Sequence, residues 1–287
     1  MLSFHAESNA LTKPSFKIPD VQSTAKVRVG SRIGKYRLDR RVGTGGFATV
    51  YAATDTLLGI KVALKIPSVE SVSQELLDEF RREARLTMRL DHPNILPIRD
   101  AAFVDGQFLI VSPLAERTLD DRLAKRMAFL TAFDLIHQLL MGVAHAHSNG
   151  VIHCDIKPEN VLLFDGNVVR LADFGIAKAV QRTISSNGTG TVGYMAPEQA
   201  MGKPSARSDV FSIGLIAYRT MSGKWPEYPF DWPMAGGANL RRRAHPDLIA
   251  ILRKTLQINP RHRHRDANAL LADWEKVRLK ATRFAKR

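Results

Sequence analysis

The hydrophobic periodicity of this 287-residue chain changes near Pro113, and this change constrains the fold more than any other feature. Before it, short runs such as residues 48–53 and 60–65 alternate or are rich in β-branched residues, which is typical of antiparallel strands. After it, apolar residues recur every three or four positions, as in residues 131–149 and 208–222, which is typical of amphipathic helices. The pattern predicts an α+β fold of two lobes, the first rich in strands and the second in helices.

The expected elements follow from this periodicity and from the turn residues at their ends. In the first lobe, residues 36–38 lead into a glycine-rich turn, and strands are predicted at residues 48–53, 60–65, 101–103 and 108–111. One helix is predicted between them, at residues 74–90, with Ser73 as its N-terminal cap. In the second lobe, helices are predicted at residues 119–125, 131–149, 208–222, 246–257 and 265–280.

These elements set the predicted boundaries of the lobes. The first lobe covers residues 36–112 and the second covers residues 113–280. Residues 1–35 are polar and show no sustained period, which predicts an N-terminal tail, and residues 281–287 form a short basic C-terminal tail.

Composition restricts the compartment and the class of protein. Cys154 is the single cysteine, so no disulfide can form within the chain, and a reducing cytoplasm is the expected location. No stretch approaches the roughly 20 consecutive apolar residues of a membrane-spanning helix, which disfavours a membrane-embedded protein. The histidines form no set with the spacing of metal ligands.

The positive charge is concentrated at one end of the chain. The chain has 42 Lys and Arg against 28 Asp and Glu, a net charge of +14, and residues 241–287 hold 14 of the first group and 4 of the second. Such a segment attracts acidic protein, nucleic acid or anionic lipid, or it is simply a solvated helical surface. Aromatic residues are not interleaved with it as in stacking platforms, which disfavours nucleic acid as the main partner.

Two short motifs carry groups suited to one kind of chemistry. Residues 153–160 read HCDIKPEN and place a carboxylate, an ammonium and an amide in one loop, and residues 173–175 read DFG and add a second carboxylate. Phosphoryl transfer from a metal-bound nucleotide requires a base for the attacking hydroxyl, a cation for the moving phosphate and oxygen ligands for magnesium. These motifs therefore indicate phosphoryl transfer.

The two motifs resemble the catalytic loop and metal-binding turn of the eukaryotic-type (Hanks-type) serine/threonine protein kinase family. The resemblance implies a bilobal protein-kinase-like fold and ATP as the phosphoryl donor. It implies that Asp155 orients the substrate hydroxyl and accepts its proton, and that Lys157 contacts the transferred phosphate. It also implies that Asn160 and Asp173 bind Mg²⁺, with Mn²⁺ as an acceptable substitute. His153 is expected to be structural and to pack on Phe174.

The resemblance extends to the nucleotide phosphates. A glycine-rich turn is expected to cradle them, because glycine lets backbone amides approach phosphate oxygens closely. It implies that Lys65 binds the phosphates and pairs with Glu83, for which Glu79, one turn earlier, is the competitor. Ala48 replaces the third glycine of the family, which leaves the path of the turn open. The residues of the turn are Gly43, Thr44, Gly45 and Gly46.

The same resemblance implies an adenine site. Val111 is expected to guard the pocket, and the backbone of Ser112 and Leu114 to form the hinge. The residues expected to sandwich the base are Val50, Ala63 and Leu162.

Further residues match the parts of the family that hold the site together. Residues 190–198 resemble the substrate-docking end of an activation segment, and Glu198 is expected to pair with a buried arginine, for which Arg263 has the right spacing. Asp209 is expected to hold the backbone of the catalytic loop. Thr191 is expected to hold the side chains of Asp155 and Lys157 in place.

Cys154 is the main departure, because the family usually has arginine there (a loop without it is called non-RD). That arginine binds a phosphate on the activation segment through charge-assisted hydrogen bonds. Its absence predicts activity that depends little on phosphorylation of this segment. Cys154 itself is either a small apolar filler or a redox switch. The hydroxyl residues concerned are Thr183, Ser185, Ser186 and Thr189.

Three functions are compatible with the motifs. The first is a serine/threonine protein kinase that acts on a protein substrate. The positive charge of residues 241–287 suggests acidic proteins as one class of substrate. The second is a catalytically silent scaffold of the same fold, disfavoured because Lys65, Asp155 and Asp173 are all present. The third is a small-molecule kinase, disfavoured by the docking segment at residues 193–198 and by the expected pairing of Glu198 with Arg263. The oligomeric state is open.

Overall fold

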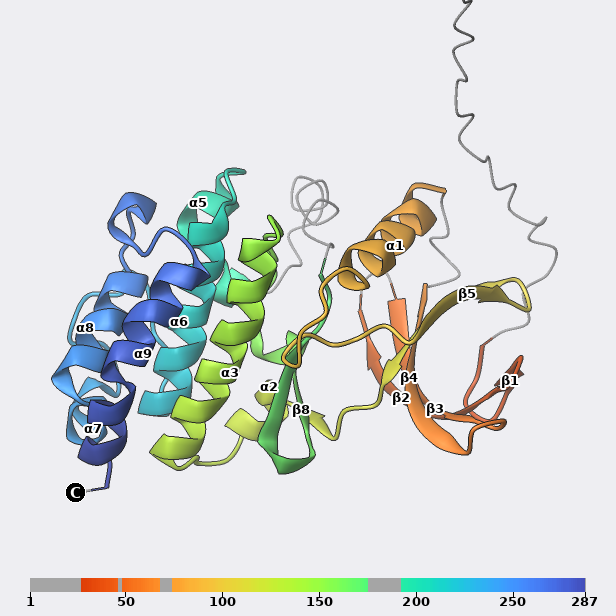
Figure 1. Ribbon diagram of the computed structural model, residues 1–287, viewed down its shortest axis with the longest axis horizontal. Coiled ribbons are helices and arrows are strands. Elements are labelled where there is room, and N and C mark those ends of the chain that lie inside the picture. Colours follow the sequence, from red (N-terminus) through yellow and green to blue (C-terminus); the bar gives the residue numbers. More distant parts are fainter. Residues whose placement is uncertain (1–26, 46–47, 68–73, 175–191, 287) are drawn as a thin grey trace, which may run out of the picture.

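A computed structural model describes residues 27–45, 48–67, 74–174 and 192–286 of the chain. The chain forms a strand-rich lobe followed by a helix-rich lobe, as Figure 1 shows. The predicted α+β class and the two-lobed arrangement are confirmed.

The first lobe is a six-stranded antiparallel sheet with one helix packed on it. The order of the strands in the sheet is β1-β2-β3-β4-β6-β5, so β5 and β6 form a hairpin at one edge. Its strands are β1 (Arg32–Ile33), β2 (Tyr36–Thr44), β3 (Ala48–Asp55), β4 (Ile60–Pro67), β5 (Asp100–Val104) and β6 (Gln107–Pro113). The helix is α1 (Gln74–Thr87), and it buries Leu77, Phe80 and Ala84 against Phe108 and Ile110 of the sheet.

The register of β3 and β4 places part of the predicted nucleotide site on one face. Val50 lies directly opposite Lys65, and Ala63 precedes Lys65 by two residues on the same strand. Because side chains two apart on a strand, and directly opposite on neighbouring strands, share a face, these three side chains lie together. All three are half-buried, whereas Leu64 between them is fully buried on the opposite face.

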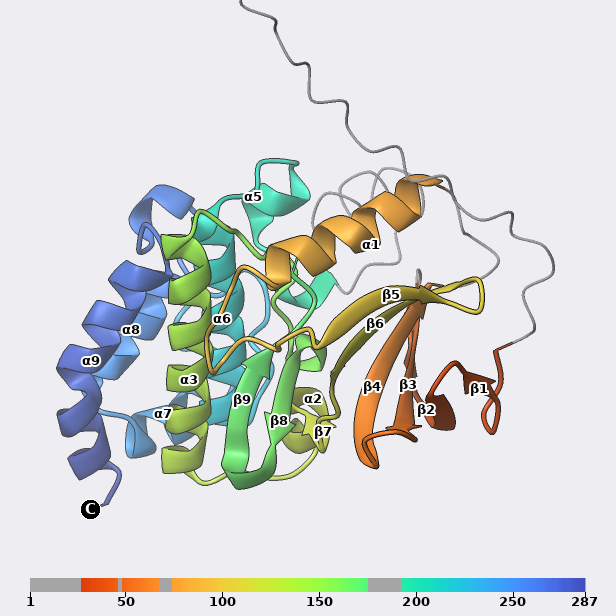
Figure 2. The same cartoon turned by 45° about the vertical axis from the view of Figure 1, so that its right-hand side comes forward.

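The second lobe packs its helices around α3 and α6 (Figure 2). Its helices are α2 (Leu119–Leu123), α3 (Phe129–Ser148), α5 (Pro197–Ala200), α6 (Ala206–Ser222), α7 (Gly237–Arg243), α8 (Pro246–Thr255) and α9 (Ala267–Phe284). A small sheet lies beside the first lobe and consists of β7 (Arg117–Thr118), β8 (Val161–Phe164) and β9 (Val168–Leu171) in that order.

Helix α3 is the core of this lobe. It is the one helix in the described part of the chain that is long and apolar enough to cross a bilayer by length and composition, and 67% of its apolar window is buried inside the protein. Ile136, Leu139, Leu140 and Val143 have no exposed surface, because α6, α9 and β9 cover them. The apolar character of α3 is therefore explained by packing within the lobe.

The observed elements differ from the predicted ones mainly at their ends. Residues 27–35, assigned from the sequence to the tail, contain β1, which pairs with β2. Helix α1 ends at Thr87, three residues before its predicted end, and its predicted cap lies outside the described residues. Helix α9 continues to Phe284, beyond the predicted end of the lobe. Helices α5 and α7, which the periodicity did not predict, have only 4 and 7 residues, too few to show a helical period.

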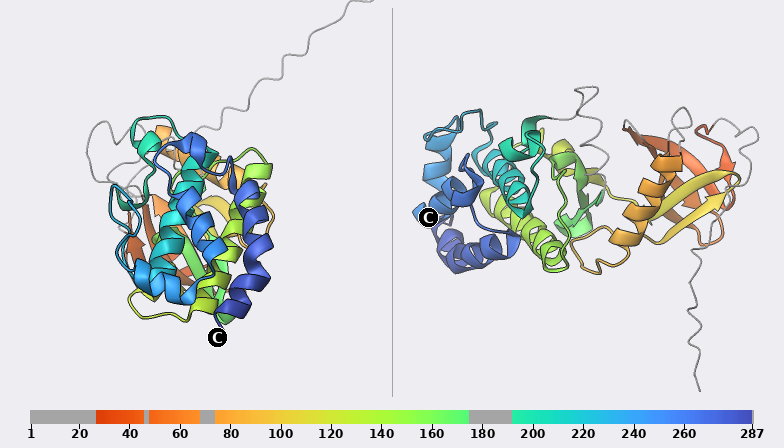
Figure 3. Two further views of the ribbon diagram at one scale, coloured as in Figure 1. Left: turned by 90° about the vertical axis from the view of Figure 1, so that its left-hand side faces the viewer. Right: turned by 90° about the horizontal axis from the view of Figure 1, so that it is seen from above.

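The view from above in Figure 3 shows the two lobes side by side along the long axis, with α1 on the side of the first lobe that faces the helices. Residue Asp173 follows β9 and reaches Lys65 of β4. The lobes therefore meet where the predicted catalytic residues lie.

Candidate active site

Lys65 lies between two carboxylates that come from different parts of the chain. Its Nζ is 2.7 and 3.0 Å from the two carboxylate oxygens of Glu83 on α1, and 2.8 Å from Oδ1 of Asp173. The competitor Glu79 is half-buried and has no such contact. The position of α1 is thus tied to the lysine, and the lysine to the segment after β9.

The pKa values of this cluster reflect one ammonium shared by two acids. Burial alone lowers the pKa of Lys65, but the carboxylates of Asp173 and Glu83 outweigh burial and raise it above its ordinary value. Burial raises the pKa of Glu83 to about 7, since the opposing effect of Lys65 is reduced by the nearby Asp173. Although burial opposes it, the Lys65 ammonium keeps the pKa of Asp173 below its ordinary value.

The catalytic loop brings the predicted base, ammonium and amide together. Nζ of Lys157 is 2.9 Å from Oδ2 of Asp155. The side-chain nitrogen of Asn160 donates hydrogen bonds to the backbone oxygen of Asp155 at 2.8 Å and to its Oδ2 at 3.1 Å. Because Pro158, Glu159 and Asn160 form a single 3₁₀ turn, the amide folds back onto the residue five positions earlier.

Asn160 and Asp173 lie on adjoining segments. The backbone N–H of Ala172 donates to the backbone oxygen of Asn160 at 2.9 Å, and Asp173 follows with φ at 62°. Asn160 donates these hydrogen bonds through its amide nitrogen, which leaves its side-chain oxygen available as an acceptor or metal ligand. One amide oxygen and one carboxylate fit a Mg²⁺ ion that takes its remaining ligands from phosphates and water. Within the described ranges, no group of three or more His, Cys, Asp or Glu residues could hold a metal.

Asp209, near the start of α6, binds the backbone of the catalytic loop. Its carboxylate accepts hydrogen bonds from the backbone N–H groups of His153 and Cys154, both at 2.8 Å. It also contacts Nε2 of His147 at 2.9 Å. Nδ1 of His147 accepts from the backbone N–H of Ala267, so Nε2 carries the proton that is donated to Asp209. The role of His147 was missed, because sequence spacing gives no sign that α3, α6 and α9 meet there.

His153 has the structural position expected of it. Its ring meets the ring of Phe174 edge to face, with 4.7 Å between centroids. Nδ1 accepts a hydrogen bond from the backbone N–H of Asp155, and Nε2 lies 2.8 Å from the backbone oxygen of Ala172, to which it donates. The histidine therefore links the catalytic loop to the segment that carries Asp173.

Cys154 occupies a strained and weakly reactive position. Its φ of 61° lies in the left-handed region, and Gln199 donates a hydrogen bond to its backbone oxygen at 2.5 Å. Burial, together with the carboxylates of Asp209 and Asp155, raises the pKa of its thiol to about 12. Because the thiolate is the reactive form of cysteine, this environment favours the filler interpretation over the redox switch.

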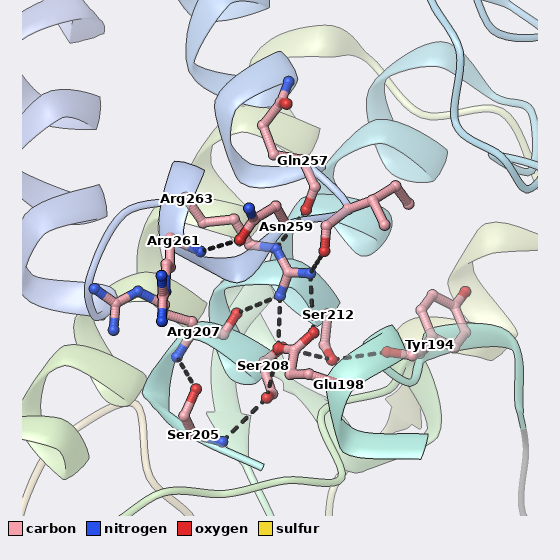
Figure 4. A network of polar contacts seen from close by, with 11 residues as sticks. Tyr194, Glu198, Ser205, Arg207, Ser208, Ser212, Gln257, Asn259, Arg261 and Arg263 are labelled. Atoms are coloured by element: carbon pink, nitrogen blue, oxygen red, sulfur yellow. Dashed lines mark hydrogen bonds and ion pairs between the residues drawn. The ribbon is translucent and has the colours of Figure 1, made fainter. Parts of the chain in front are cut away.

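A bidentate ion pair supports the docking segment (Figure 4). The guanidinium of Arg263 donates to both carboxylate oxygens of Glu198, at 2.7 and 3.0 Å. Its remaining donors reach the backbone oxygens of Arg207, Gln257 and Ile258. The arginine side chain has no exposed surface. Each of its guanidinium nitrogens donates to an oxygen of the protein, as a buried arginine requires.

The segment before α5 lies against the catalytic loop. The Ser212 hydroxyl donates to the backbone oxygen of Tyr194 at 2.7 Å, and the Tyr194 ring meets the Trp225 ring edge to face. A Cβ at Gly193 would come within 2.7 Å of Trp225, so only glycine fits there. A small pocket between this segment and the loop is lined by Cys154, Asp155, Ile156, Lys157, Tyr194, Met195, Gln199 and Ser212.

The predicted nucleotide-binding residues come from both lobes. In the glycine turn, the Gly45 N–H donates to the backbone oxygen of Ala48 at 2.8 Å, which closes the turn between β2 and β3. Ala63 lies opposite Ser112 on β6, and Leu162 comes from β8 of the second lobe. Val111 lies on β6 and is buried, and Leu114 directly follows β6 and is half-buried. Contact of these residues with a nucleotide stays a prediction, and Gly46, Gly175 and Thr191 lie outside the described residues.

Comparison with known proteins agrees with this geometry. The protein kinase domain family matches residues 36–274. The chain is 32% identical to serine/threonine-protein kinase PrkC of Bacillus subtilis over 282 residues, which cover 89% of the chain and 43% of PrkC. It is 38% identical to serine/threonine-protein kinase PknA of Mycobacterium tuberculosis over 213 residues, which cover 69% of the chain and 49% of PknA. The chain thus spans less than half the length of these curated relatives.

A solved structure shows the same fold. The PknI kinase domain of Mycobacterium tuberculosis superposes with a TM-score of 0.66 and 24% sequence identity. The match covers 87% of this chain and 99% of that one. At this level of identity the comparison establishes the arrangement of the two lobes.

Proposed function

Because this chain belongs to the protein kinase family, we propose that it transfers the γ-phosphoryl group of ATP to a serine or threonine hydroxyl of a protein. The observation that carries the proposal is the convergence of Lys65, Asp155 and Asp173, which come from three separate segments. Asn160 connects the last two, through its side chain to Asp155 and through its backbone to the residue before Asp173.

Each charged group then has a defined task. Asp155 orients the substrate hydroxyl and accepts its proton, and Asn160 holds the carboxylate in place for this. Lys157, 2.9 Å from that carboxylate, contacts the phosphoryl group during transfer. Lys65, fixed by Glu83, positions the α- and β-phosphates of ATP.

The metal ligands would be Asn160 and Asp173. A bound Mg²⁺ ion supplies charge neutralisation to the phosphate oxygens. Lys65 pairs with Oδ1 of Asp173, which leaves the other carboxylate oxygen for the ion. Manganese satisfies the same oxygen donors.

A protein substrate is supported by the docking segment. Glu198, Arg263 and Ser208 hold α5 by hydrogen bonds, and this fixes the segment that faces the catalytic loop across the small pocket. A rigid surface beside Asp155 is suited to an extended peptide. The single cysteine fits a cytoplasmic location for this activity.

Label transfer from γ-labelled ATP tests the proposal. The unmodified chain should label itself or a general protein substrate in the presence of magnesium. Asp155→Asn and Asp173→Asn should each lower transfer by roughly two to four orders of magnitude. Asp91→Asn, which removes an exposed carboxylate outside the site, is the matched control and should retain full activity.

The outcomes separate the alternatives. ATP binding without transfer to any acceptor would favour a silent scaffold. Transfer to a small alcohol such as an aminoglycoside, without transfer to protein, would favour a small-molecule kinase. Activity that survives in both Asn variants would remove the proposed roles of the two carboxylates.

A further inference from the structure

A dense group of cations lies at the end of the helical lobe that is opposite α5, at the bottom of Figure 2. It combines the connection between α2 and α3, helix α7 and the end of α9. We call it the basic end, and it consists of Lys125, Arg126, Arg241, Arg242, Arg243, Arg283 and Lys286. All of these side chains are exposed except Arg243, which is half-buried.

Arg243 joins α7 to the start of α3. Its guanidinium donates to the backbone oxygen of Met127 at 3.0 Å and to that of Met221 at 3.3 Å, and it lies over the ring of Phe129. Burial lowers the pKa of Arg243, and the nearby positive charge of Arg126 lowers it further. Two cations of the basic end are therefore close enough to repel each other.

The end of α9 adjoins the turn between α7 and α8. The ring of Phe284 meets that of His245 edge to face, with 5.7 Å between centroids. Lys280 of α9 forms an ion pair with Asp247 at 2.8 Å. Arg283 and Lys286 at the end of α9 thus belong to the same end of the lobe as the α7 arginines.

The basic end lacks acidic partners in the part of the chain that the structure describes. On α9, Lys276, Arg278 and Lys280 each form an ion pair. None of the seven cations of the basic end does so with a described residue. Their mutual repulsion costs stability, and an anionic partner would relieve it.

An exposed leucine lies among these cations. Leu279 on α9 has 71% of its surface exposed. Arg283 follows it by four residues and shares its face of the helix, as do Lys276, three residues before it, and Glu275, four residues before it. An exposed apolar side chain next to a group of cations is the pattern of surfaces that insert into the headgroup region of a membrane.

The basic end is remote from the chemistry. Helix α3 has 20 residues and is about 30 Å long; His147 near its end contacts the aspartate under the catalytic loop, while Phe129 at its start lies under Arg243. An extended peptide needs about nine residues to cover this distance. The cations are thus too far away to select residues next to the phosphorylated hydroxyl, and a partner bound there leaves the active site open.

We propose that the basic end docks on a bilayer surface that contains anionic phospholipids. The exposed lysines and arginines bind the headgroup phosphates and carboxylates, and Leu279 enters the boundary between headgroups and acyl chains. Nucleic acid fits less well, because the exposed apolar residue is aliphatic and offers no face for base stacking.

Vesicle binding by the whole chain tests the proposal. The protein should sediment with vesicles of phosphatidylcholine and phosphatidylserine, less so as salt is added, and should stay in solution with phosphatidylcholine alone. The triple variant Lys125→Ser, Arg126→Ser and Arg241→Ser should bind about a hundredfold more weakly, at about fivefold per cation. Its matched control removes three exposed arginines elsewhere (Arg28→Ser, Arg89→Ser and Arg99→Ser) and should bind within a fewfold of the unmodified chain.

The leucine provides a second, independent readout. Leu279→Ser should weaken binding about tenfold, while Leu57→Ser, which alters an exposed leucine of the other lobe, should not. In a Leu279→Trp variant, the added fluorescence should be quenched by lipids brominated on their acyl chains. Equal losses in the two triple variants, or no quenching, would overturn the proposal. The proposal would also be overturned if the first triple variant lost binding to double-stranded DNA or polyglutamate but still bound the vesicles.

Discussion

The Arg263 guanidinium and the Glu198 carboxylate form a bidentate ion pair in which the arginine is completely shielded from solvent. The pair joins α5 to the loop that precedes α9. The guanidinium also lies 4.4 Å from the centre of the Phe211 ring on α6. One side chain therefore fixes α5 to helix α6 and to the segment that follows α8.

Removing one partner of this pair should strongly destabilise the protein. Glu198→Gln leaves a buried guanidinium without its counter-charge, which costs roughly 3–5 kcal/mol of unfolding free energy. Urea denaturation measures the loss. Lys276→Ala, which breaks an exposed ion pair with Asp273, is the control and should cost under about 1 kcal/mol. A Glu198→Gln variant as stable as this control would contradict the structural role of the pair.

The ion pair of Lys65 with Glu83 should give the enzyme an acid limb near neutral pH. Burial raises the pKa of Glu83 to about 7, so this acid is charged above that pH and protonated below it. Protonation removes the charge that holds Lys65 in place, and kcat/KM for ATP should therefore fall as the pH decreases below about 7. In Glu83→Gln the value should be low, and this limb should be absent. A limb of the same position in Glu83→Gln would assign it to another group.

Much of this site could be predicted from the sequence, because its parts lie in short motifs with fixed spacing. The order of Lys65, Asp155 and Asp173 along the chain indicates the chemistry, and the structure places Glu83 rather than Glu79 against the lysine. The contact of His147 with the aspartate below the loop could not be predicted, since it depends on how three helices pack.

The fold too has parts that the sequence predicts and parts that it does not. Period-two and period-3.6 patterns predicted the long elements, whereas β1 and β7 have 2 residues each and α5 has 4, too few for any period. The order of strands in the first sheet likewise follows from long-range pairing that a single sequence does not display. Element ends shifted by a few residues, because capping and tertiary contacts decide them.

Asp209 should be needed both for stability and for catalysis. Asp209→Ala leaves the backbone N–H groups of His153 and Cys154 buried without acceptors, at a cost of about 1–3 kcal/mol each. The loop that carries Asp155 then loses its support, so kcat should fall more than KM for ATP rises. His147→Ala removes the hydrogen bonds of the ring to Asp209 and from the backbone of Ala267, but keeps both backbone bonds of Asp209, and should have a smaller effect on kcat. Equal effects of the two variants would contradict this ranking.

Cys154 should react slowly and should not regulate the enzyme. Because burial raises the pKa of its thiol to about 12, almost no thiolate exists at neutral pH. Alkylation by iodoacetamide, followed by mass spectrometry, should be much slower for the folded chain than for the unfolded chain. Phosphoryl transfer should be equal in peroxide and in reductant, and Cys154→Ser should behave alike in both. A loss of activity in peroxide that Cys154→Ser prevents would establish the redox switch.

Activity should depend little on phosphorylation of the activation segment. The hydroxyl residues concerned lie outside the described residues and are Thr183, Ser185, Ser186 and Thr189; the low dependence is expected because position 154 is a cysteine. A thiol cannot form the charge-assisted hydrogen bonds by which arginine orders a phosphorylated segment. Changing all four to alanine should leave most of the phosphoryl transfer to an added substrate.

The substitution Cys154→Arg tests the same idea in the opposite direction, because it should make the activity dependent on phosphorylation. It restores the usual phosphate receptor beside Asp155, so phosphatase treatment should lower the activity of this variant severalfold and leave the unmodified chain nearly unchanged. Urea denaturation of each protein checks that the fold is retained. If the four alanines abolished transfer in a folded chain, other cations would have to serve as the receptor, and the substitution at position 154 would no longer explain regulation.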